Sequence, residues 1–270
     1  MSIPSGSLPY AGSAASPGLP QGIDAWLDDG VLSVKLDPSQ ADAENPAFDQ
    51  AMQRLLQDVA ADAAVRVVVL RGADQGFCAG LSAPDPGDTA ECWYPRGLAQ
   101  LPQPVVAIVT GSCSGAAFAV LDGCDIVLAA DDTAFSLPQV DEGSFPDGRT
   151  ACAISDLMTP RAARYYALTG DRFDSVRAER DGLISRSLPA ADLERESCAL
   201  ARELAAKDAT ALQFTKETLR HVGSMSWDAV LSFTAAKFAE LKALQAGRPS
   251  TRAAAVESFL AGKSKPGLGG

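Results

Sequence analysis

The chain has 270 residues, 47% of them hydrophobic, which is enough for one well-buried domain. Its formal net charge of −11 excludes nucleic acid as a general partner, because an acidic surface repels the phosphate backbone. No apolar run reaches the roughly 20 residues that cross a bilayer, so no membrane partner is expected. Residues 1–22 lack the basic start and apolar core of a secretory signal, and their Ser, Gly, Pro and Ala residues predict a flexible N-terminal arm.

Cysteine and histidine usage favours a reduced protein without a metal. Six cysteines are scattered through apolar contexts with no CxxC pair, which is typical of a soluble cytoplasmic protein. His221 is the only histidine in the sequence, and no cysteine or carboxylate cluster at ligand spacing accompanies it. A protein-bound zinc site is therefore not expected.

Strands alternate with helices in the first half of the chain. Alternating or continuous apolar residues predict strands, and apolar residues at helical spacing predict a helix over 44–62. The apolar face of that helix would consist of Phe48, Met52, Leu55, Leu56 and Val59. The predicted strands are 30–37, 65–70, 105–109, 126–130 and 134–137. A helix is also expected to begin at Ala116.

The second half of the chain is predicted to be mainly helical from Asp147 onwards. The pattern as a whole indicates an α/β fold followed by a helical C-terminal region, an architecture that many enzyme classes share. The predicted helices are 148–158, 160–169, 175–182, 190–207, 208–222, 226–246 and 250–261.

A glycine-rich turn follows each of two predicted buried strands, at 72–80 and at 111–115. Small residues such as Ala79, Gly80 and Gly115 let a ligand approach the backbone closely. A turn that opens into a helix points unpaired N–H groups outward with a partial positive charge. Two such turns side by side would hold an oxyanion. The alternative interpretation is tight packing of strands on helices, which also needs small residues.

The motifs V-R-V-V-V-L-R-G-A-x-x-x-F-C-A-G, L-P-Q-P-V-V-A-I-V-T-G, C-D-I-V-L-A-A-D-D-T-A-F-S-L-P and A-L-T-G-D-R-F-D occur in this order. Together they resemble the crotonase (enoyl-CoA hydratase/isomerase) superfamily over residues 24–266. The resemblance implies a crotonase-like spiral of ββα turns over 23–200 and a C-terminal helical trimerisation or lid region over 201–270. It also implies an acyl-CoA or related thioester as substrate with no bound cofactor, an enolate-like intermediate, and a homotrimer or a dimer of trimers.

The resemblance assigns the two oxyanion N–H groups to Leu81 and Ala116. Most family members have glycine at the position of Ala116, but alanine is acceptable because the main-chain N–H is the group used. The tail F-L-A-G-K-S-K-P-G-L at 259–268 resembles that of hydroxycinnamoyl-CoA hydratase-lyases. Its Lys263 and Lys265 would either contact nucleotide phosphates as point charges or remain solvated.

The sequence departs from the family at the two glutamates with which its hydratases place and activate water. The resemblance puts these positions at Ala119 and Gln139. Alanine cannot move a proton, and an amide donates and accepts hydrogen bonds but is no base at neutral pH. Hydration by a glutamate pair is therefore not expected.

Asp147 is the acid that remains in this part of the sequence. It resembles the proton shuttle of certain double-bond isomerases of the family, and it lies near the nucleophile position of a family dehalogenase. A base that works near pH 7 needs surroundings that raise its pKa, and Phe145 is compatible with such a setting. The alternative is a plain helix N-cap. Arg149 would either pair with Asp147 and lower its pKa or hold a second carboxylate of the substrate.

The loop over 82–96 is shorter than is usual in the family. It contains Trp93 and Tyr94, which would either line the acyl pocket or cover the core or a subunit contact. Four functions stay open. The first is an acyl-thioester isomerase, the second a hydratase or hydratase-lyase with relocated acid–base groups, the third a decarboxylase and the fourth a non-catalytic thioester-binding protein.

Overall fold

The computed structural model of the chain describes residues 8–10, 22–37, 46–72, 76–77 and 94–246. The chain divides into two compact units, Met1–Ala206 and Lys207–Gly270, and each is described by itself. The described part of the second unit contains the helices α8 (Ala209–Val222) and α9 (Trp227–Leu244). The first unit contains the sheets and the candidate site.

In the described residues, seven strands form the larger sheet in the order β1-β2-β3-β4-β5-β7-β10. The pairs β1–β2 and β2–β3 are antiparallel, and β3, β4, β5, β7 and β10 run parallel to their neighbours. Continuous apolar runs suit the central parallel strands, because both of their faces are covered. The strands are β1 (Leu8–Pro9), β2 (Ile23–Asp28), β3 (Val31–Leu36), β4 (Val67–Arg71), β5 (Val105–Val109), β7 (Ile126–Ala130) and β10 (Arg186–Leu188).

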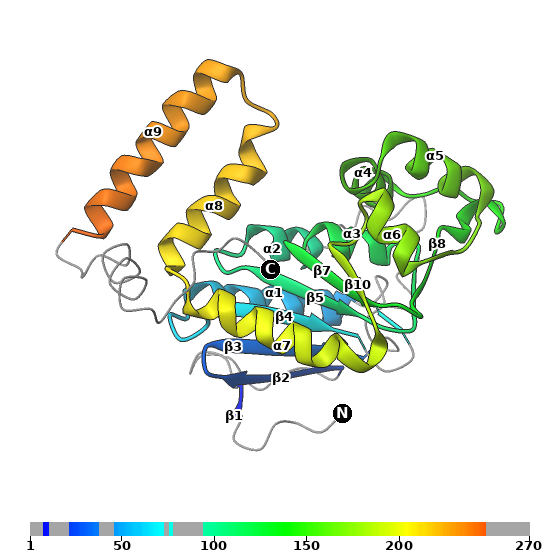
Figure 1. Ribbon diagram of the computed structural model, residues 1–270, viewed down its shortest axis with the longest axis horizontal. Helices are drawn as coiled ribbons and strands as arrows, with labels where there is room; N and C mark the ends of the chain where they lie inside the picture. The colour runs from blue at the N-terminus through cyan, green and yellow to red at the C-terminus, as the bar shows by residue number, and fades with distance from the viewer. Residues whose placement is uncertain (1–7, 11–21, 38–45, 73–75, 78–93, 247–270) are drawn as a thin grey trace. The chain divides into compact units, whose positions relative to one another are not determined.

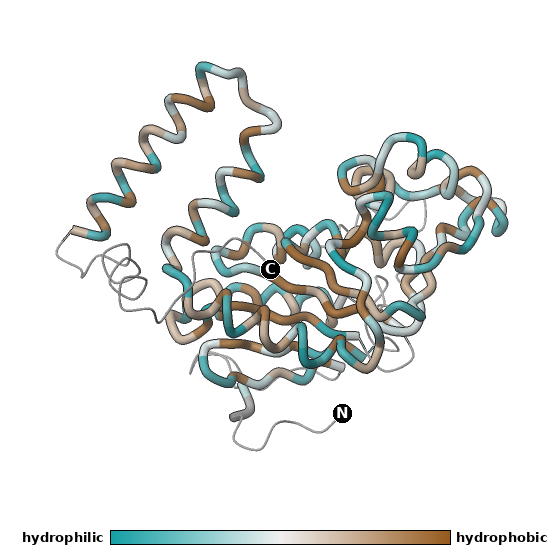
Figure 2. Tube along the Cα trace, viewed as in Figure 1, coloured by the Kyte–Doolittle hydropathy of each residue, from teal (hydrophilic) through white to brown (hydrophobic). Residues whose placement is uncertain are grey.

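Helices cover both faces of this sheet (Figure 1). Val68 and Leu70 of β4 belong to the same core cluster as the apolar face of α1 (Pro46–Ala61). The alternate residue Val69 lines a cavity beside α7 (Ala190–Ala206), and α7 packs against β3, β4 and β7. Successive side chains of a strand point to opposite faces, so one strand supplies both layers. The hydrophobic colour runs along these central strands in Figure 2.

A smaller sheet positions the segments that follow the second glycine-rich turn. Its described strands have the order β6-β8-β9, and Phe135 of β8 stacks on Phe173 of β9 with ring centroids 5.7 Å apart. The 3₁₀ helix η1 follows β8 directly, and α4 begins a few residues later. The elements are β6 (Ser112–Ser114), α3 (Ala117–Asp122), β8 (Ala134–Ser136), η1 (Pro138–Val140), α4 (Gly148–Leu157), α5 (Pro160–Thr169), β9 (Phe173–Asp174) and α6 (Ser175–Asp181).

The strongly periodic elements agree with the sequence prediction, and several short ones were missed. The five residues expected on the apolar face of α1 are all buried. The prediction omitted β1, β2, β6, β9 and β10. Of these, β2 pairs with the adjacent β3, whereas β6, β9 and β10 pair with strands farther away along the chain. It also treated 82–96 as a loop, whereas α2 (Tyr94–Gln100) begins at Tyr94. The predicted helix 250–261 lies outside the described residues.

Part of the expected N-terminal arm is held by the larger sheet. β1 pairs with β2, and the N–H of Tyr10 donates to the carbonyl oxygen of Ala25 at 2.9 Å. The Tyr10 side chain is 7% exposed, and its hydroxyl donates to Asp62 at 3.3 Å. Leu8, Pro9 and Tyr10, which belong to the expected arm, are thus paired with the larger sheet.

Candidate active site

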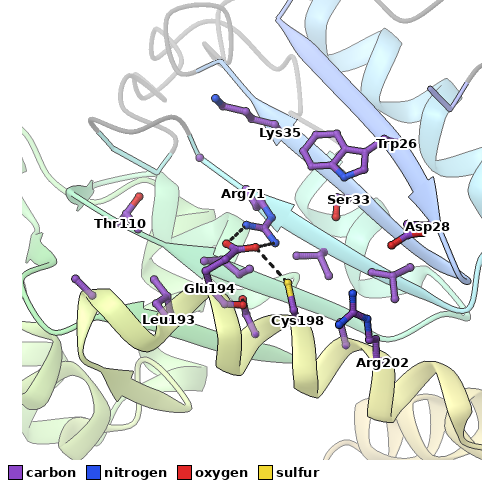
Figure 3. Close-up of a pocket in the computed structure, with 17 residues that line it drawn as sticks. Trp26, Asp28, Ser33, Lys35, Arg71, Thr110, Leu193, Glu194, Cys198 and Arg202 are labelled. Atoms are coloured by element: carbon purple, nitrogen blue, oxygen red, sulfur yellow. Dashed lines mark hydrogen bonds and ion pairs between the residues drawn. The ribbon is translucent and has the colours of Figure 1, made fainter. Parts of the chain in front are cut away.

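Strand β4 ends in an ion pair that ties the start of the first glycine-rich turn to α7. Nη1 and Nη2 of Arg71 lie 2.5 Å and 3.2 Å from the two carboxylate oxygens of Glu194, which is a bidentate arrangement. The thiol of Cys198 donates to the same carboxylate at 3.2 Å. Figure 3 shows these side chains in contact with one another where they line a cavity of about 290 Å³ between the sheet and α7. Gly72, the first residue of the first turn, and Thr110, which precedes the second turn, also line this cavity.

The ion pair sets the charge state of this cavity. Burial raises the pKa of the Glu194 carboxyl, but the hydrogen bond and charge of Arg71 outweigh burial and hold that pKa below its usual range. Burial is also the main reason why the pKa of the Cys198 thiol is raised. Sequence reasoning missed this group, because its members are 123 residues apart and no local pattern connects them.

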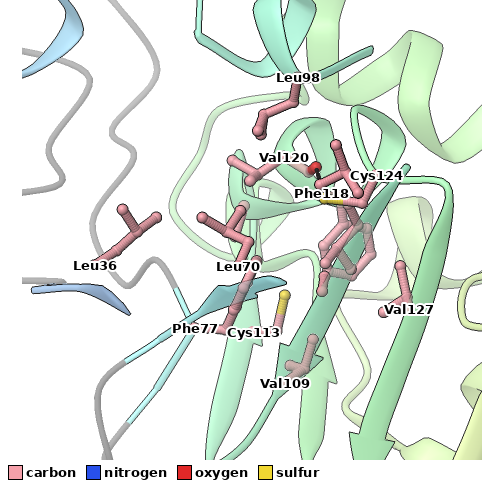
Figure 4. Packing of buried hydrophobic residues seen from close by; sticks show 14 of the residues in the cluster. Leu36, Leu70, Phe77, Leu98, Val109, Cys113, Phe118, Val120, Cys124 and Val127 are labelled. Carbon is pink, nitrogen blue, oxygen red and sulfur yellow. Dashed lines mark hydrogen bonds between the residues drawn. The ribbon is translucent and has the colours of Figure 1, made fainter. Parts of the chain in front are cut away.

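The two glycine-rich turns are joined by a backbone hydrogen bond. The N–H of Phe77, in the first turn, donates to the carbonyl oxygen of Ser112, at the start of the second, at 2.9 Å. Phe77 has no exposed surface and lies in the core cluster with Leu70 and Cys113 (Figure 4). The described parts of the turns therefore lie side by side.

The second turn presents the N–H of Ala116. Gly115 has a φ of +57°, which favours glycine, and its own N–H donates to the carbonyl oxygen of Ser136 at 3.1 Å. The next N–H, that of Ala116, has no acceptor among the described residues. It is one of the two predicted oxyanion groups. The other, Leu81, lies outside the described residues, as do Ala79 and Gly80.

Gln139 lies directly against this turn. Its Nε2 atom is 3.2 Å from the position that a Cβ atom on Gly115 would occupy. Its Oε1 atom is buried and has no hydrogen-bond partner among the described residues. Ala119, at the other missing-glutamate position, is 8% exposed on α3. Neither side chain can take up or release a proton near neutral pH.

Asp147 caps α4. Its Oδ1 atom accepts a hydrogen bond from the N–H of Thr150 at 2.8 Å, and its Oδ2 atom lies 3.3 Å from Nε of Arg149. Its backbone is extended, with φ −61° and ψ 168°, as N-cap residues require. Both alternatives raised by the sequence, the N-cap and the pairing with Arg149, are thus present in the structure.

The pKa of Asp147 lies below its usual range. Burial raises the pKa, but the hydrogen bonds from Thr150 and the charge of Arg149 together outweigh burial. Phe145 is 76% exposed and does not enclose the carboxylate in apolar surroundings. Of the two alternatives for Arg149, the one that lowers the pKa of Asp147 is present, because the cap and the guanidinium both favour the charged form.

The remaining predicted binding residues are partly accounted for. Tyr94 is 1% exposed and packs edge-on against Phe48 with ring centroids 5.9 Å apart, so its ring belongs to the core. Trp93, Lys263 and Lys265 lie outside the described residues. Within the described chain, no three His, Cys, Asp or Glu side chains gather as they would around a metal ion. None of the described helices is both long enough and apolar enough to span a membrane.

The chain matches known proteins along most of its length. The family model described as "Enoyl-CoA hydratase/isomerase" matches residues 27–254. A hydroxycinnamoyl-CoA hydratase-lyase from Pseudomonas fluorescens is 29% identical, with 91% of this chain and 95% of that protein covered. A 1,2-epoxyphenylacetyl-CoA isomerase from Escherichia coli (strain K12) is 28% identical, with 90% and 96% covered.

The fold also matches a solved structure. An enoyl-CoA hydratase from Bacillus anthracis aligns with a TM-score of 0.78 at 21% identity, over 91% of this chain and 98% of that chain. This similarity concerns the fold alone. It confirms the predicted α/β class, with sheets followed by C-terminal helices.

Proposed function

The chain belongs to the enoyl-CoA hydratase/isomerase family, and we propose that it moves a double bond within an acyl-CoA or another acyl thioester. The observation that carries the proposal is the N–H of Ala116, which has no acceptor among the described residues. It lies in a turn that is hydrogen-bonded to the turn leading to Leu81. Such donors stabilise an oxyanion more than they stabilise the ground-state carbonyl.

In this mechanism the thioester oxygen accepts hydrogen bonds from the N–H groups of Ala116 and Leu81. The carboxylate of Asp147 takes a proton from the carbon α or γ to the carbonyl, and the electron pair of that C–H bond moves toward the thioester oxygen. The resulting enolate regains the proton from Asp147 at the other carbon. The double bond has then moved, and no other reactant is consumed.

The low pKa of Asp147 determines how much of the catalysis comes from this base and how much from the oxyanion hole. A carboxylate with a lowered pKa is ionised and ready to accept a proton at neutral pH, but it is a weak base. The oxyanion hole must then supply most of the stabilisation, by making the carbon acid stronger. The relative from Escherichia coli, named as an isomerase of 1,2-epoxyphenylacetyl-CoA, supports isomerisation of an acyl-CoA by this scaffold.

Proton exchange tests the proposal directly. A β,γ-unsaturated acyl-CoA is incubated with the enzyme in deuterated water, and deuterium incorporation and double-bond position are followed by mass spectrometry and NMR. Asp147→Asn keeps a cap acceptor but removes the base, so it is expected to bind the thioester and to lose exchange by at least about 100-fold. Exchange by the variant at the wild-type rate would rule the mechanism out.

Decarboxylation of an acyl thioester is the second candidate. Two observations favour it. Thr150 donates a hydrogen bond to Asp147 and Arg149 forms an ion pair with it, and Ala119 and Gln139 cannot ionise. Loss of CO₂ leaves its electron pair on the α-carbon, so the enolate forms without a base. Arg149, with a side chain 29% exposed, could hold the departing carboxylate. Release of CO₂ from malonyl-CoA that survives in Asp147→Asn would select this reaction.

Two further functions have weaker support. A hydratase-lyase is supported by the relative from Pseudomonas fluorescens, but it would have to move its acid–base work away from Ala119 and Gln139. Water addition to a hydroxycinnamoyl thioester would favour it. A non-catalytic thioester-binding protein would bind acyl-CoA without turnover of any thioester.

The assembly and setting also remain proposals. Four large apolar side chains of α9 are exposed, and no described residue of this helix is buried. This surface favours association through the 201–270 region into a homotrimer or a dimer of trimers. Sedimentation of the wild type against a variant with Phe238→Ser tests it. The exposed side chains of α9 are Trp227, Leu231, Phe238 and Leu244.

A cytoplasmic setting fits the scattered cysteines without a CxxC pair.

A further inference from the structure

Four arginines on or next to α5 and α6 have no partner among the described residues. Each of them is exposed, and none forms a hydrogen bond or an ion pair with a described residue. They line two hollows that share Tyr166 and Arg177, so they belong to one continuous surface over the two neighbouring helices (Figure 1), which we call the arginine surface. The four are Arg161, Arg164, Arg172 and Arg180.

The acidic residues of the same segment are used by the fold, whereas these arginines are not. Five arginines and four acids lie between residues 160 and 181. Each acid has a hydrogen-bond or ion-pair partner in the described structure, while Arg177 alone among the five arginines has one. The other four cations are left for a group outside the chain. The acids and their partners are Asp171 with the hydroxyl of Tyr165 at 2.8 Å, Asp174 with the N–H of Arg177 at 2.8 Å, Glu179 with the N–H of Ser187 at 2.7 Å, and Asp181 with Nε of Arg177 at 3.4 Å.

Apolar side chains accompany these cations. Tyr165, Leu168 and Val176 are exposed and line the same two hollows. A chain with a net charge of −11 does not need unpaired cations for solubility, so arginines beside exposed apolar groups indicate a docking surface. A bare polyanion would use the charges alone, whereas a folded acidic protein offers carboxylates and apolar side chains together. The composition of the surface therefore favours an acidic protein as the partner.

The arginine surface is close to the proposed oxyanion donor. Helix α5 packs against η1, and Gly170 at the end of α5 lies directly against Asp141 at the end of η1. On η1, Gln139 lies against Gly115, which precedes Ala116. One short element thus separates a partner on α5 from the turn that would hold the thioester.

We propose that the arginine surface docks an acidic acyl carrier protein, which delivers its thioester to Ala116 on a phosphopantetheine arm. The delivery rests on the proposed function, because it assumes that an acyl thioester reacts at Ala116. The arm is common to CoA and to carrier proteins, so one thioester site accepts both, and the arginine surface attracts the protein part. Exposed charges act mainly on the rate of association, so the preference appears in kcat/KM and weakens with salt.

One acyl group on two carriers tests the proposal. The but-3-enoyl group is presented on pantetheine, which is uncharged, and on a bacterial fatty-acid acyl carrier protein. The wild type is expected to have a kcat/KM at least about tenfold higher for the carrier protein at about 50 mM NaCl, and most of this advantage should disappear at about 500 mM. Binding of the carrier protein without an acyl group is measured by calorimetry.

Charge reversal locates the docking surface. Arg164→Glu and Arg172→Glu, one in each hollow, should each lower kcat/KM for the carrier protein several-fold, and together by at least about tenfold. The pantetheine thioester should change by less than about twofold. Arg54→Glu makes the same charge change at an exposed residue of α1 that also lacks a partner among the described residues, and should leave both substrates unaffected. Arg164→Gln with Arg172→Gln replaces the reversed pair if that variant does not fold.

The outcomes separate the docking surface from the proposed function. An unchanged kcat/KM for the carrier protein in the double variant overturns the proposal, and so does an equal loss in Arg54→Glu. Dissociation of an oligomer by the double variant, measured by sedimentation, also overturns it, because a second copy of the chain would then cover the surface. Carrier binding that the double variant loses, without turnover of any thioester by the wild type, overturns the proposed function and leaves the docking surface standing.

Discussion

The backbone N–H of Phe77 donates to the carbonyl oxygen of Ser112 at 2.9 Å, and this bond holds the two glycine-rich turns together. Neither turn belongs to the larger sheet, although each follows one of its adjacent strands, β4 and β5. The relative position of the described parts of the two turns thus depends on local backbone packing at this contact.

Gly72→Ala is expected to disturb that contact. A Cβ atom at residue 72 would lie 2.5 Å from the carbonyl oxygen of Gly76 and 2.7 Å from Cα of Phe77, so the backbone itself would have to move. We expect a loss of about 1–3 kcal/mol in the free energy of unfolding, measured with urea, and a fall in kcat/KM. Gly223→Ala is the matched control, because no atom of the described residues outside its own local backbone lies within 4 Å of its Cβ position. Equal effects of the two substitutions would contradict this prediction.

Asp147 is expected to show separate effects on stability and activity. Asp147→Ala removes the cap of α4 and should lower the free energy of unfolding by about 1 kcal/mol. Asp147→Ser keeps an oxygen that can accept from the N–H of Thr150 and should be nearly as stable as the wild type. Both variants lack the carboxylate, so both should lose proton exchange. Activity that follows stability across the series would show that Asp147 acts only as a cap.

Gln139→Leu is expected to make the protein more stable in the absence of ligand. The substitution removes a buried acceptor that no described residue satisfies, which should raise the free energy of unfolding by about 1 kcal/mol. Thermal unfolding without and with acyl-CoA measures the effect. Gln53→Leu, which breaks the hydrogen bond to Asp49, should be neutral or slightly destabilising. A less stable Gln139→Leu would show that the amide has a structural partner.

Ionisation of Tyr10 is expected to lower the stability of the folded protein at alkaline pH. Burial, followed by the charge and hydrogen bond of Asp62, raises the pKa of Tyr10 to about 12. The pKa of Tyr10 is higher in the folded protein than in the unfolded chain. The stability that the protonated Tyr10 side chain contributes is therefore fully present below the ordinary tyrosine pKa. It decreases as pH rises through the folded pKa. Tyr10→Phe should therefore show a shallower loss of stability at alkaline pH in urea titrations. Identical slopes for both proteins would contradict this assignment.

The sequence predicted those parts of the fold that depend on local periodicity. The apolar face of α1 and the buried strand β5 follow directly from the spacing and continuity of their side chains. Strand β10, in contrast, has three residues and is defined by its pairing with β7, more than fifty residues earlier. Such strands have no pattern of their own, so their prediction requires knowledge of their partners.

The candidate site was predictable to the same degree. The small residues of the second turn indicated a close approach to the backbone, and only the family resemblance pointed to the N–H of Ala116, which follows a glycine at positive φ. The pKa of Asp147 was not predictable, since the sequence left open whether Arg149 pairs with Asp147 or holds a carboxylate of the substrate. The bidentate pair of Arg71 and Glu194 has no sequence signal, because folding alone brings its members together.

Ala119 and Gln139, at the two positions where the resemblance predicts missing glutamates, do not ionise. This affects how the reaction rate depends on pH. A bell-shaped dependence requires one group that must lose a proton and another that must keep one. In the proposed isomerase Asp147 alone titrates at the reacting carbons, and its pKa lies below the usual range. The profile would therefore rise once at acid pH and then stay level, a plateau on which catalysis is insensitive to the acidity of its surroundings.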